Sequence, residues 1–533
     1  MNRIYIFLVL ILLSNTIIRA QDSEWTVQLE PIIIEGLPGA QSYAFGRIEG
    51  YWIIIGGRLD GLHQRQPFAS FDPIHNNKEI ILIEASSNKS WSVSLNSLPS
   101  RMKEQLQSAN MQFHQKGEYL YLTGGYGYSE IDDEHITYPY LTRVDLKELK
   151  EAILSDMDIR PAFVQKECND CAVAGGRLEM IEDQYYLVGG HYFHGRYNPH
   201  GPDHGPGFTQ VYTGEVRIFN IENSVNDFNF DFEESIKNEM HLGKRDYNLI
   251  PQIRDGEEML VAFSGVFQKH IDLPYLYPVE IFQNNVLAIE SFSQYLNHYH
   301  CATIPIYDLE NEKMNNLFFG GIAQFYFEDD VMVQDNNVPF VKSISNVSYT
   351  EEEGWKESLL AIEMPDYFGA GSEFILADNV PVYNNGVIKL NELDQEQTIG
   401  YIYGGIKSSA PNIFWINNGS QSEATPTIFK VSIKKSHSVS STEVGLDEPY
   451  FIIVPNPNRG YFRIIYNSAS AADEIQISIQ DLKGNRLGNM EFQNVTKGKN
   501  YFEVGIPNLK NGLYLVQLES EGKKIVRKVV VEN

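Results

Sequence analysis

The sequence contains few cysteines, and this excludes one class of fold. Its three cysteines, Cys168, Cys171 and Cys301, are too few to form a disulfide scaffold in a chain of 533 residues. Cys168 and Cys171 could bond to each other in an oxidising compartment, which would leave Cys301 alone. A Cys-x-x-Cys pair by itself does not indicate zinc, because no second Cys or His pair stands at ligand spacing.

Positive charge is also scarce. The chain has 42 Lys and Arg against 70 Asp and Glu, and its formal net charge is −28 at pH 7. Nucleic acids and anionic membranes bind proteins through basic patches, so this balance opposes nonspecific binding to either. We expect no nucleic-acid partner, and solubility is the simplest explanation of the acidic surface.

Long apolar runs are missing after the first residues of the chain. Arg3 precedes an apolar run from Ile4 to Leu13, and Ile18-Arg19-Ala20 offers a cleavage site before Gln21. This layout is typical of a secretory signal peptide and predicts one over residues 1–20. Elsewhere there is no apolar stretch of about 18 residues, so we expect no transmembrane segment in the mature protein. No cysteine follows the cleavage site, so a lipoprotein anchor is not expected either.

Several common catalytic motifs are absent from the sequence. It contains no phosphate-binding GxxxxGK[ST] loop, no HExxH zinc motif and no GxSxG nucleophile elbow. The acidic clusters Asp132-Asp133-Glu134 and Glu328-Asp329-Asp330 could offer oxygen ligands to calcium, but neither has the spacing of a known calcium loop. The simpler interpretation of both clusters is solvated surface.

A short apolar run that ends in a small-residue pair recurs six times between Trp25 and Lys435. Glycine suits places where φ is positive or where backbones approach closely, so a recurring pair indicates one structural unit used repeatedly. Many short apolar strands broken by Gly, Asn, Asp and Pro predict an all-β architecture. The six pairs are Gly56-Gly57, Gly124-Gly125, Gly189-Gly190, Ser264-Gly265, Gly320-Gly321 and Gly404-Gly405.

These units resemble the kelch repeat, in which a glycine pair closes the second strand of a four-stranded propeller blade. Glu79–Ile83 followed by Trp91 looks like the third strand, turn and tryptophan of such a blade, and Glu215–Phe219 looks like another third strand. The resemblance implies a kelch-like β-propeller over residues 21–440, with six blades favoured and seven as the alternative. Trp25–Leu29 could supply the outer strand of the last blade. The sequence departs from the kelch pattern at Ser264 and in its longer repeats, and the rival architecture is an array of β-sandwiches.

The end of the chain carries a different set of motifs. Residues 441–449 would form a linker, and residues 450–533 are rich in strand-forming residues and turn signals. They resemble the type A sorting domain of the type IX secretion system of Bacteroidetes. The resemblance implies a small β-sandwich, the type IX secretion machinery as a partner, and a secreted or outer-surface location. The residues that carry it are Pro455, Asn456, Pro457, Gly460, Asp481, Gly484, Gly512 and Tyr514.

Propeller topology converts sequence position into a candidate binding face. Loops that follow the glycine pairs and segments that lead into each first strand emerge on the same face, and binding sites are commonly built from loops on a rigid scaffold. Arg245 and Asp246 could contact a polar ligand there, or could form a structural salt bridge instead. The residues expected to bind ligand are Arg245, Asp246, Tyr247, His298, Tyr299 and His300.

The loop from His191 to Gly207 is unusually rich in histidine. Imidazole is a common ligand of transition metals, so His191, His194, His200 and His204 are candidate metal ligands. The alternative is an exposed loop stiffened by Pro and Gly, in which the histidines are incidental. No cofactor is fixed by the sequence, and a transition metal or calcium is the candidate.

The sequence leaves three kinds of function open. The favoured one is an exported protein that binds an extracellular ligand, a glycan or another surface polymer, through its loop-rich face. The first alternative is an enzyme on the same face, either a metal-dependent oxidase or a sugar isomerase or lyase. Copper radical oxidases built on kelch propellers invite comparison with Tyr299 and His300, with His298 and Cys301 nearby. The second alternative is a protein-interaction or adhesion module without chemistry.

Overall fold

The computed structural model divides the chain into two compact units, Met1–His437 and Ser438–Asn533. It describes residues 18–19, 25–66, 68–199, 201, 205, 207–328 and 331–435 of the first unit. In the second unit it describes residues 450–454, 460–468, 471–481, 483, 485–496, 498–506, 509–520 and 523–531. Among these residues, no helix is both long and apolar enough to cross a membrane.

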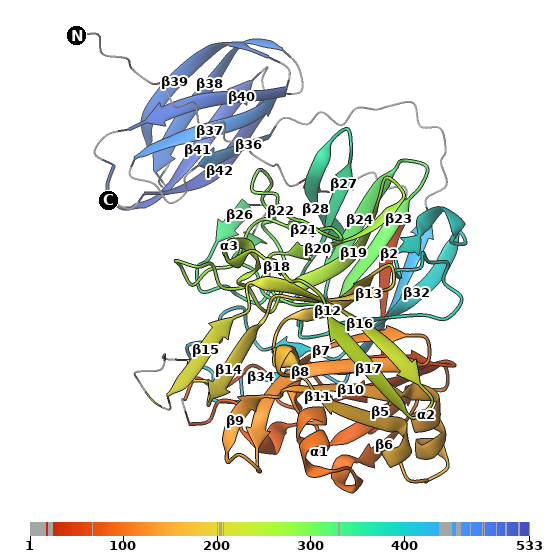
Figure 1. Cartoon of the computed structure of the whole chain (residues 1–533). Helices are drawn as coiled ribbons and strands as arrows, with labels where there is room; N and C mark the ends of the chain where they lie inside the picture. The colour runs from red at the N-terminus through yellow and green to blue at the C-terminus, as the bar shows by residue number, and fades with distance from the viewer. Residues whose placement is uncertain are drawn as a thin grey trace, which may run out of the picture. The chain divides into compact units, whose positions relative to one another are not determined.

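The first unit is a propeller of six blades, each built on four antiparallel strands (Figure 1). Blade 1 contains β3 (Ala44–Ile48), β4 (Tyr51–Ile55), β5 (Glu79–Glu84) and β6 (Lys89–Ser94). Blade 2 contains β7 (Ala109–Lys116), β8 (Tyr119–Ser129), β10 (Tyr140–Asp145) and β11 (Phe163–Glu167). Blade 3 contains β12 (Arg177–Ile181), β13 (Gln184–Val188), β16 (Glu215–Ser224) and β17 (Asp227–Phe232).

The remaining three blades follow the same order. Blade 4 contains β19 (Asn248–Arg254), β20 (Glu257–Phe263), β21 (Val279–Ile281) and β22 (Val286–Ala288). Blade 5 contains β23 (Thr303–Asp308), β24 (Lys313–Phe319), β27 (Ser343–Thr350) and β28 (Gly354–Glu363). Blade 6 contains β30 (Glu373–Leu376), β32 (Glu396–Tyr403), β35 (Ile428–Lys435) and, from the start of the chain, β2 (Trp25–Ile32).

Strand β2, from near the start of the chain, closes the propeller. β2 pairs with β35 from Trp25 opposite Lys435 to Ile32 opposite Ile428, and in Figure 1 the red β2 stands among the blue-green strands of blade 6. Trp25 and Val27 are buried in the same apolar cluster as residues of β35. The prediction that residues near Trp25 supply the outer strand of the last blade is therefore confirmed.

Five of the six small-residue pairs directly follow the second strand of their blade, as predicted, whereas Gly124-Gly125 lies within β8, which continues to Ser129. All twelve residues have positive φ, including Ser264 at 54°. The N–H of the second residue of each pair donates to a backbone carbonyl in the segment that leads into the next blade, so these pairs link neighbouring blades around the whole circle. The donors and acceptors are Gly57 to Ser108, Gly125 to Val173, Gly190 to Lys244, Gly265 to His298, Gly321 to Phe368 and Gly405 to Ala40.

We expect Gly320→Ala to destabilise the propeller far more than Gly386→Ala. A Cβ at Gly320 would lie 2.1 Å from the carbonyl oxygen of Phe368, whereas a Cβ at Gly386 would have no heavy atom within 4 Å. Both glycines have positive φ, 61° and 84°. Alanine at either position must therefore adopt the left-handed conformation, which costs about 1 kcal/mol. The clash should raise the Gly320→Ala cost to about 3 kcal/mol or more. Urea denaturation measures the free energy of unfolding of both variants. Equal losses of stability would show that close packing around Gly320 is unimportant.

Apolar side chains fill the spaces between neighbouring blades. Ile53 and Ile55 of blade 1, for example, share one buried cluster with Leu120 and Leu122 of blade 2. Helix α2 (Leu146–Leu154) packs into this cluster and begins at Asp145, whose carboxylate accepts the N–H of Glu148 at 2.9 Å. Among the residues that the structure describes, the other α-helices are α1 (Ser100–Leu106) and α3 (Glu239–Leu242).

Short strands outside the four-stranded pattern lie mainly in the loops after the small-residue pairs. The most prominent is a hairpin of β14 (His191–Gly195) and β15 (Phe208–Tyr212), which extends the sheet of blade 2 through β9 (Glu134–Thr137). The others are β1 (Ile18–Arg19), β18 (Ile236–Lys237), β25 (Phe325–Glu328), β26 (Val331–Gln334), β29 (Tyr367–Ala370), β31 (Ile388–Lys389), β33 (Ile406–Ser408) and β34 (Ser422–Ala424).

The C-terminal unit is a β-sandwich of two antiparallel sheets around one apolar core. One sheet has the order β36-β37-β40 and the other β39-β38-β41-β42. Alternating side chains of both sheets, such as Phe462 and Ile464, or Ile477 and Ile479, are buried between them. The strands are β36 (Tyr450–Val454), β37 (Tyr461–Ser468), β38 (Ala472–Asp481), β39 (Arg486–Val495), β40 (Gly498–Gly505), β41 (Gly512–Ser520) and β42 (Lys523–Val531).

The motif residues of this unit that the structure describes stabilise its turns. Asp481 ends β38 and accepts the N–H groups of Lys483 and Asn485, each at 2.9 Å. Gly460 has a φ of 83° and accepts the N–H of Ile506 at 2.8 Å. Gly512 begins β41, and the hydroxyl of Tyr514 donates to the carbonyl of Lys510 at 2.8 Å. Pro455, Asn456, Pro457 and Gly484 lie outside the described residues.

Candidate functional site

A closed ring of backbone hydrogen bonds surrounds the propeller axis. One residue from each blade takes part, placed before or at the start of the first strand, and each donates its N–H to the carbonyl of the next. The six bonds run from Ser42 to Gly371, Gly371 to His300, His300 to Asp246, Asp246 to Gly175, Gly175 to Asn110 and Asn110 to Ser42, with lengths from 2.8 to 3.2 Å. This axial ring fixes the positions of the Ser42, Asn110, Asp246 and His300 side chains on a rigid base.

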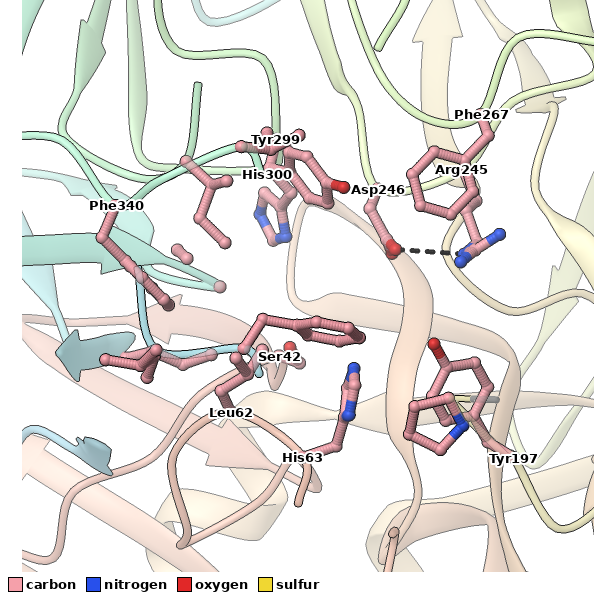
Figure 2. Close-up of a pocket in the computed structure, with 18 of the residues that line it drawn as sticks. Ser42, Leu62, His63, Tyr197, Arg245, Asp246, Phe267, Tyr299, His300 and Phe340 are labelled. Atoms are coloured by element: carbon pink, nitrogen blue, oxygen red, sulfur yellow. Dashed lines mark ion pairs between the residues drawn. The ribbon is translucent and has the colours of Figure 1, made fainter. Parts of the chain in front are cut away.

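A cavity of about 670 Å³ opens above the axial ring (Figure 2). Its walls come from the loops that follow the small-residue pairs of blades 1, 3, 4, 5 and 6. The predicted loop-rich face therefore encloses a cavity, although the loop after Gly125 of blade 2 supplies no residue to its lining in the described part of the chain. A volume of this size suits a small organic ligand or one end of a polymer.

Arg245 and Asp246 lie on one side of the cavity floor. Arg245 Nε is 3.3 Å from Asp246 Oδ2, and a guanidinium nitrogen of Arg245 donates to the hydroxyl of Tyr212. Burial disfavours the charged guanidinium, but Tyr212 and Asp246 more than offset this and raise the pKa of Arg245. The Phe267 ring lies 5.1 Å from the Arg245 guanidinium carbon. Figure 2 shows Tyr299 beside Asp246, with its hydroxyl pointing toward the carboxylate.

His300 occupies the floor next to Asp246 and belongs to a buried chain of charged groups. Its Nε2 lies 2.9 Å from Oε1 of Glu373, and Arg177 Nη1 lies 3.0 Å from the same oxygen. Glu373 begins β30 and Arg177 begins β12, so this chain joins blades 3, 5 and 6 at the axis. Burial alone would raise the pKa of Glu373, but Arg177 and His300 hold that pKa below its usual value.

Aromatic rings line the opposite side of the cavity. His63 lies among Phe71, Tyr197 and Phe414, at ring-centroid distances of 6.0, 4.8 and 5.7 Å. Burial among these rings lowers the pKa of His63 to about 4, so the imidazole is neutral at pH 7. Burial also raises the pKa of Tyr197, and its neutral hydroxyl points toward the centre of the cavity in Figure 2.

The six predicted ligand-binding residues separate into two groups. Arg245, Asp246, Tyr299 and His300 line the cavity. Tyr247 is buried below it, where its hydroxyl donates to the carbonyl of Val188 at 2.6 Å. His298 is wholly buried, and both of its ring nitrogens bond to backbone groups of Gln294 and Gln324, at 3.0 and 2.9 Å. His298 thus stabilises the fold and lies outside the cavity lining.

We expect His298 to make the propeller less stable in acid. Because Nδ1 accepts the N–H of Gln324 and Nε2 donates to Gln294, the fold requires the neutral ring. Burial lowers the pKa of His298 to about 4, while an unfolded histidine titrates near 6.5. The unfolded chain therefore binds a proton first as pH falls from about 6.5 to about 4, and about 3 kcal/mol of stability is lost over this window.

Urea denaturation at pH 7.5 and pH 4.5 measures this effect, with His298→Gln as the control. The variant should be less stable than the wild type at pH 7.5 but should lose less stability on acidification, because it has no imidazole to protonate. Carboxylates elsewhere titrate in both the wild type and the variant. The difference between the pH dependences of stability of these two proteins therefore isolates the contribution of His298. An identical pH dependence would contradict the assignment of a neutral, doubly bonded ring.

The histidine-rich loop forms the β14–β15 hairpin, which is one wall of the cavity. His191 is buried and its Nδ1 lies 2.7 Å from Nε2 of Gln210, whereas His194, three residues along the same strand, is exposed on the opposite face. His200 and His204 lie outside the described residues. In the part of the chain that is described, no group of three or more His, Cys, Asp or Glu side chains is placed to hold a metal ion. Metal binding by this loop stays a prediction.

The cysteines are placed away from the cavity. Cys168 and Cys171 form a disulfide. Cys301 is buried in an apolar cluster with Phe292 and Phe318, and burial raises the pKa of its thiol to about 12. A copper radical site built on Tyr299 and His300 would also require a cysteine bonded to a tyrosine and a second histidine. Cys301 is instead buried in an apolar cluster, and both ring nitrogens of His298 bond to backbone groups.

Sequence reasoning did not single out several residues of the site. Glu373 and Arg177 gave no signal, because each is one charged residue at the start of a strand. The loop from Ser409 to Gln421 contributes Phe414 and Trp415 to the cavity. The sequence does contain a signal for this loop: it follows the sixth small-residue pair, Gly404-Gly405, as the other lining loops follow the other pairs.

The sequence of the C-terminal unit matches a known family. Residues 452–532 match the family described as a secretion system C-terminal sorting domain. The unit is a type IX sorting domain. Such sorting domains mark proteins that the type IX secretion system exports to the cell surface or the extracellular space, and they act through the secretion machinery. The protein is therefore secreted or displayed at the cell surface by a secretion system of the Bacteroidetes type. The propeller is the part of the chain that this domain exports.

Comparison with solved structures shows distant likenesses to three proteins. YjhT is 10% identical, covers 74% of this chain and 97% of its own, and has a TM-score of 0.39. A fungal alcohol oxidase of the AA5 family, in complex with copper, is 9% identical, with coverages of 96% and 99% and a TM-score of 0.36. PorZ, a surface component of the type IX secretion system of Porphyromonas gingivalis, is 9% identical, with coverages of 92% and 75% and a TM-score of 0.15.

These likenesses are too weak to carry an argument about the site. The assignment of a six-bladed propeller rests instead on the strand pairing and the closed axial ring of this chain. No curated protein matches the chain.

Proposed function

We propose that the exported propeller binds an extracellular glycan, with a sugar unit held in the axial cavity. The observation that carries this proposal is the composition of the cavity: fixed hydrogen-bonding side chains on the floor and aromatic rings on the walls. The floor offers Ser42, Asn110, Asp246, Tyr299 and His300, and the walls offer Phe71, Tyr197, Phe267, Phe340 and Phe414.

This combination matches the two kinds of surface that a sugar ring presents. Hydroxyl groups around the edge of the ring need both donors and acceptors, which carboxylate, amide, imidazole and hydroxyl side chains provide. The C–H groups on the faces of the ring pack against aromatic side chains, which gain from covering apolar surface. Because the axial ring fixes the floor residues, little conformational entropy should be lost when a ligand binds.

The charge balance favours a neutral sugar over an anionic one. Arg58 forms two hydrogen bonds with the carboxylate of Asp60, each 2.7 Å long. Arg245 pairs with Asp246, and Arg177, in the channel below, pairs with Glu373. Each of these three arginines is thus compensated by a carboxylate, and Asp272 adds another acidic group to the lining. An acidic sugar would have to compete with these carboxylates for the same cations.

One observation favours a second candidate, acid–base catalysis on the bound sugar. Nε2 of His300 lies 2.9 Å from the Glu373 carboxylate at the floor of the cavity, and a histidine beside a carboxylate is a common general base. An isomerase or lyase reaction would use it to remove a proton from carbon or oxygen of the sugar. Incubating the protein with each sugar that binds, and following the sugar by NMR, separates the two candidates: unchanged sugar supports binding alone.

The direct test is a binding screen of the full exported protein against purified glycans. The panel should contain neutral oligosaccharides such as cello-, xylo- and manno-oligosaccharides, together with uronic-acid oligosaccharides of similar length. Calorimetry should show one binding site per chain for at least one series of neutral oligosaccharides. The uronic-acid oligosaccharides should bind more weakly. Failure of the whole panel to bind would overturn the proposal.

A further inference from the structure

Trp415 is an exposed aromatic residue at the rim of the axial cavity. It lies in the loop from Ser409 to Gln421, between β33 and β34, and it is one of the residues that line the opening. Its side chain is 53% exposed, whereas its neighbour Phe414 faces inward against His63. The exposed indole offers a broad apolar surface to the solvent at the mouth of the cavity.

The indole ring is held in one orientation although it is exposed. The guanidinium carbon of Arg65 lies 4.4 Å from the centre of the Trp415 ring, and Arg65 Nη1 donates to the Trp415 carbonyl at 3.0 Å. The indole N–H donates to Oδ1 of Asn337 at 3.2 Å, and the Phe414 ring meets the indole edge-on at 5.1 Å. These contacts restrain the rotation of the side chain before any ligand arrives.

The loop that carries Trp415 is anchored to blade 1. The buried side chain of Asn417 donates to the carbonyls of Leu62 and His63, at 2.8 and 2.9 Å. The backbone carbonyl of Asn417 accepts the N–H of Arg65 at 3.1 Å. Trp415 is therefore fixed relative to the His63 side of the cavity.

The same loop is also anchored to blade 5. Pro411 accepts the N–H of Phe340 at 2.9 Å, and Asn412 donates to the carboxylate of Asp335 at 2.7 Å. Two neighbouring blades thus hold the loop, together with the bond from the indole to Asn337. Rigid support of this kind is what distinguishes a prepared binding surface from an incidental exposed side chain.

We infer that Trp415 is a second sugar subsite, on which the unit next to the one in the cavity stacks. This inference rests on the proposed function and extends it: the ligand is an oligosaccharide or a polymer end with at least two neutral sugar units. The open face of an oriented indole covers the apolar face of a sugar ring, as aromatic platforms do elsewhere. Binding should therefore strengthen with chain length, and the increase should depend on Trp415.

The test measures affinity against ligand length for the full exported protein. Cello-, xylo- and manno-oligosaccharides of one to four units are titrated into the wild type, Trp415→Ala, Trp415→Phe and Ile416→Ala. Ile416 is the matched control, because it is the adjacent residue and is 64% exposed. Thermal unfolding of each variant confirms that the fold is retained, which we expect because both side chains are exposed.

We expect Trp415→Ala to weaken binding of the two- to four-unit ligands about tenfold and to leave single-unit binding unchanged. Trp415→Phe should retain part of the affinity, and Ile416→Ala should match the wild type. Fluorescence gives an independent signal: longer ligands should shift the emission of the wild type but not of Trp415→Phe.

Two different failures can be told apart. If the wild type binds none of the oligosaccharides, the proposed function is overturned and the second subsite with it. If the wild type binds sugars but Trp415→Ala weakens single units and longer ligands equally, or weakens neither, then the cavity binds sugar and only the second subsite is overturned.

Discussion

Removal of residues 438–533 should abolish export of the propeller. These residues form a compact unit of their own that contains the sorting domain, and the type IX machinery recognises its cargo through such a domain. In a bacterium that carries the system, the truncated protein should accumulate in the periplasm, while the full chain reaches the surface or the medium. Cell fractionation and immunoblotting against the propeller measure the distribution.

The truncation leaves the propeller itself complete. Its last blade is closed by β2 pairing with β35, and both strands lie before residue 438. The truncated protein should therefore resist proteases as the full chain does, which serves as the control for folding. Release of a folded, truncated propeller in wild-type amounts would contradict the role assigned to the sorting domain.

Asp246→Asn should weaken glycan binding about 10- to 100-fold without unfolding the propeller. Asp246 lies at the floor of the cavity, where its carboxylate pairs with Arg245 at 3.3 Å. Asparagine keeps the shape but removes the charge and one acceptor, so Arg245 loses its charged partner and the ligand loses a strong hydrogen-bond acceptor. Asparagine also tolerates the φ of 50° at this position, so the backbone bonds of the axial ring should persist.

Asp255→Asn is the matched control for this prediction. Asp255 also has a positive φ, 52°, but it lies exposed in the turn between β19 and β20 and does not line the cavity. Calorimetry with the best ligand of the binding screen should show wild-type affinity for Asp255→Asn and a large loss for Asp246→Asn. Equal affinities for the two variants would remove Asp246 from the binding site.

The features that the sequence predicted are those that constrain residue type locally. A position with positive φ and a backbone carbonyl about 2 Å from a would-be Cβ admits little except glycine, so Gly124, Gly320 and Gly404 are visible in the sequence. The exception, Ser264, also has a positive φ, 54°, and its hydroxyl donates to the carbonyl of Tyr275 at 2.6 Å. The turn at Asp481 in the sorting domain is equally local, since its partners lie within four residues.

The residues that sequence reasoning could not sort are those whose role depends on distant contacts. His298 and His300 stand two positions apart in one segment, yet His298 is bonded to backbone groups of Gln294 and Gln324, while His300 faces the cavity. Nothing within the segment distinguishes them. Glu373 likewise acquires its place only when blades 3, 5 and 6 meet at the axis, because its partners Arg177 and His300 come from the other two blades.

The most direct measurement is a crystal structure of the full exported protein with the oligosaccharide that binds best in the screen. We expect the terminal sugar in the axial cavity, hydrogen-bonded to Asp246 and His300, with the next unit stacked on Trp415. Sugar bound on the outside of a blade, with the axial cavity empty, would contradict the account.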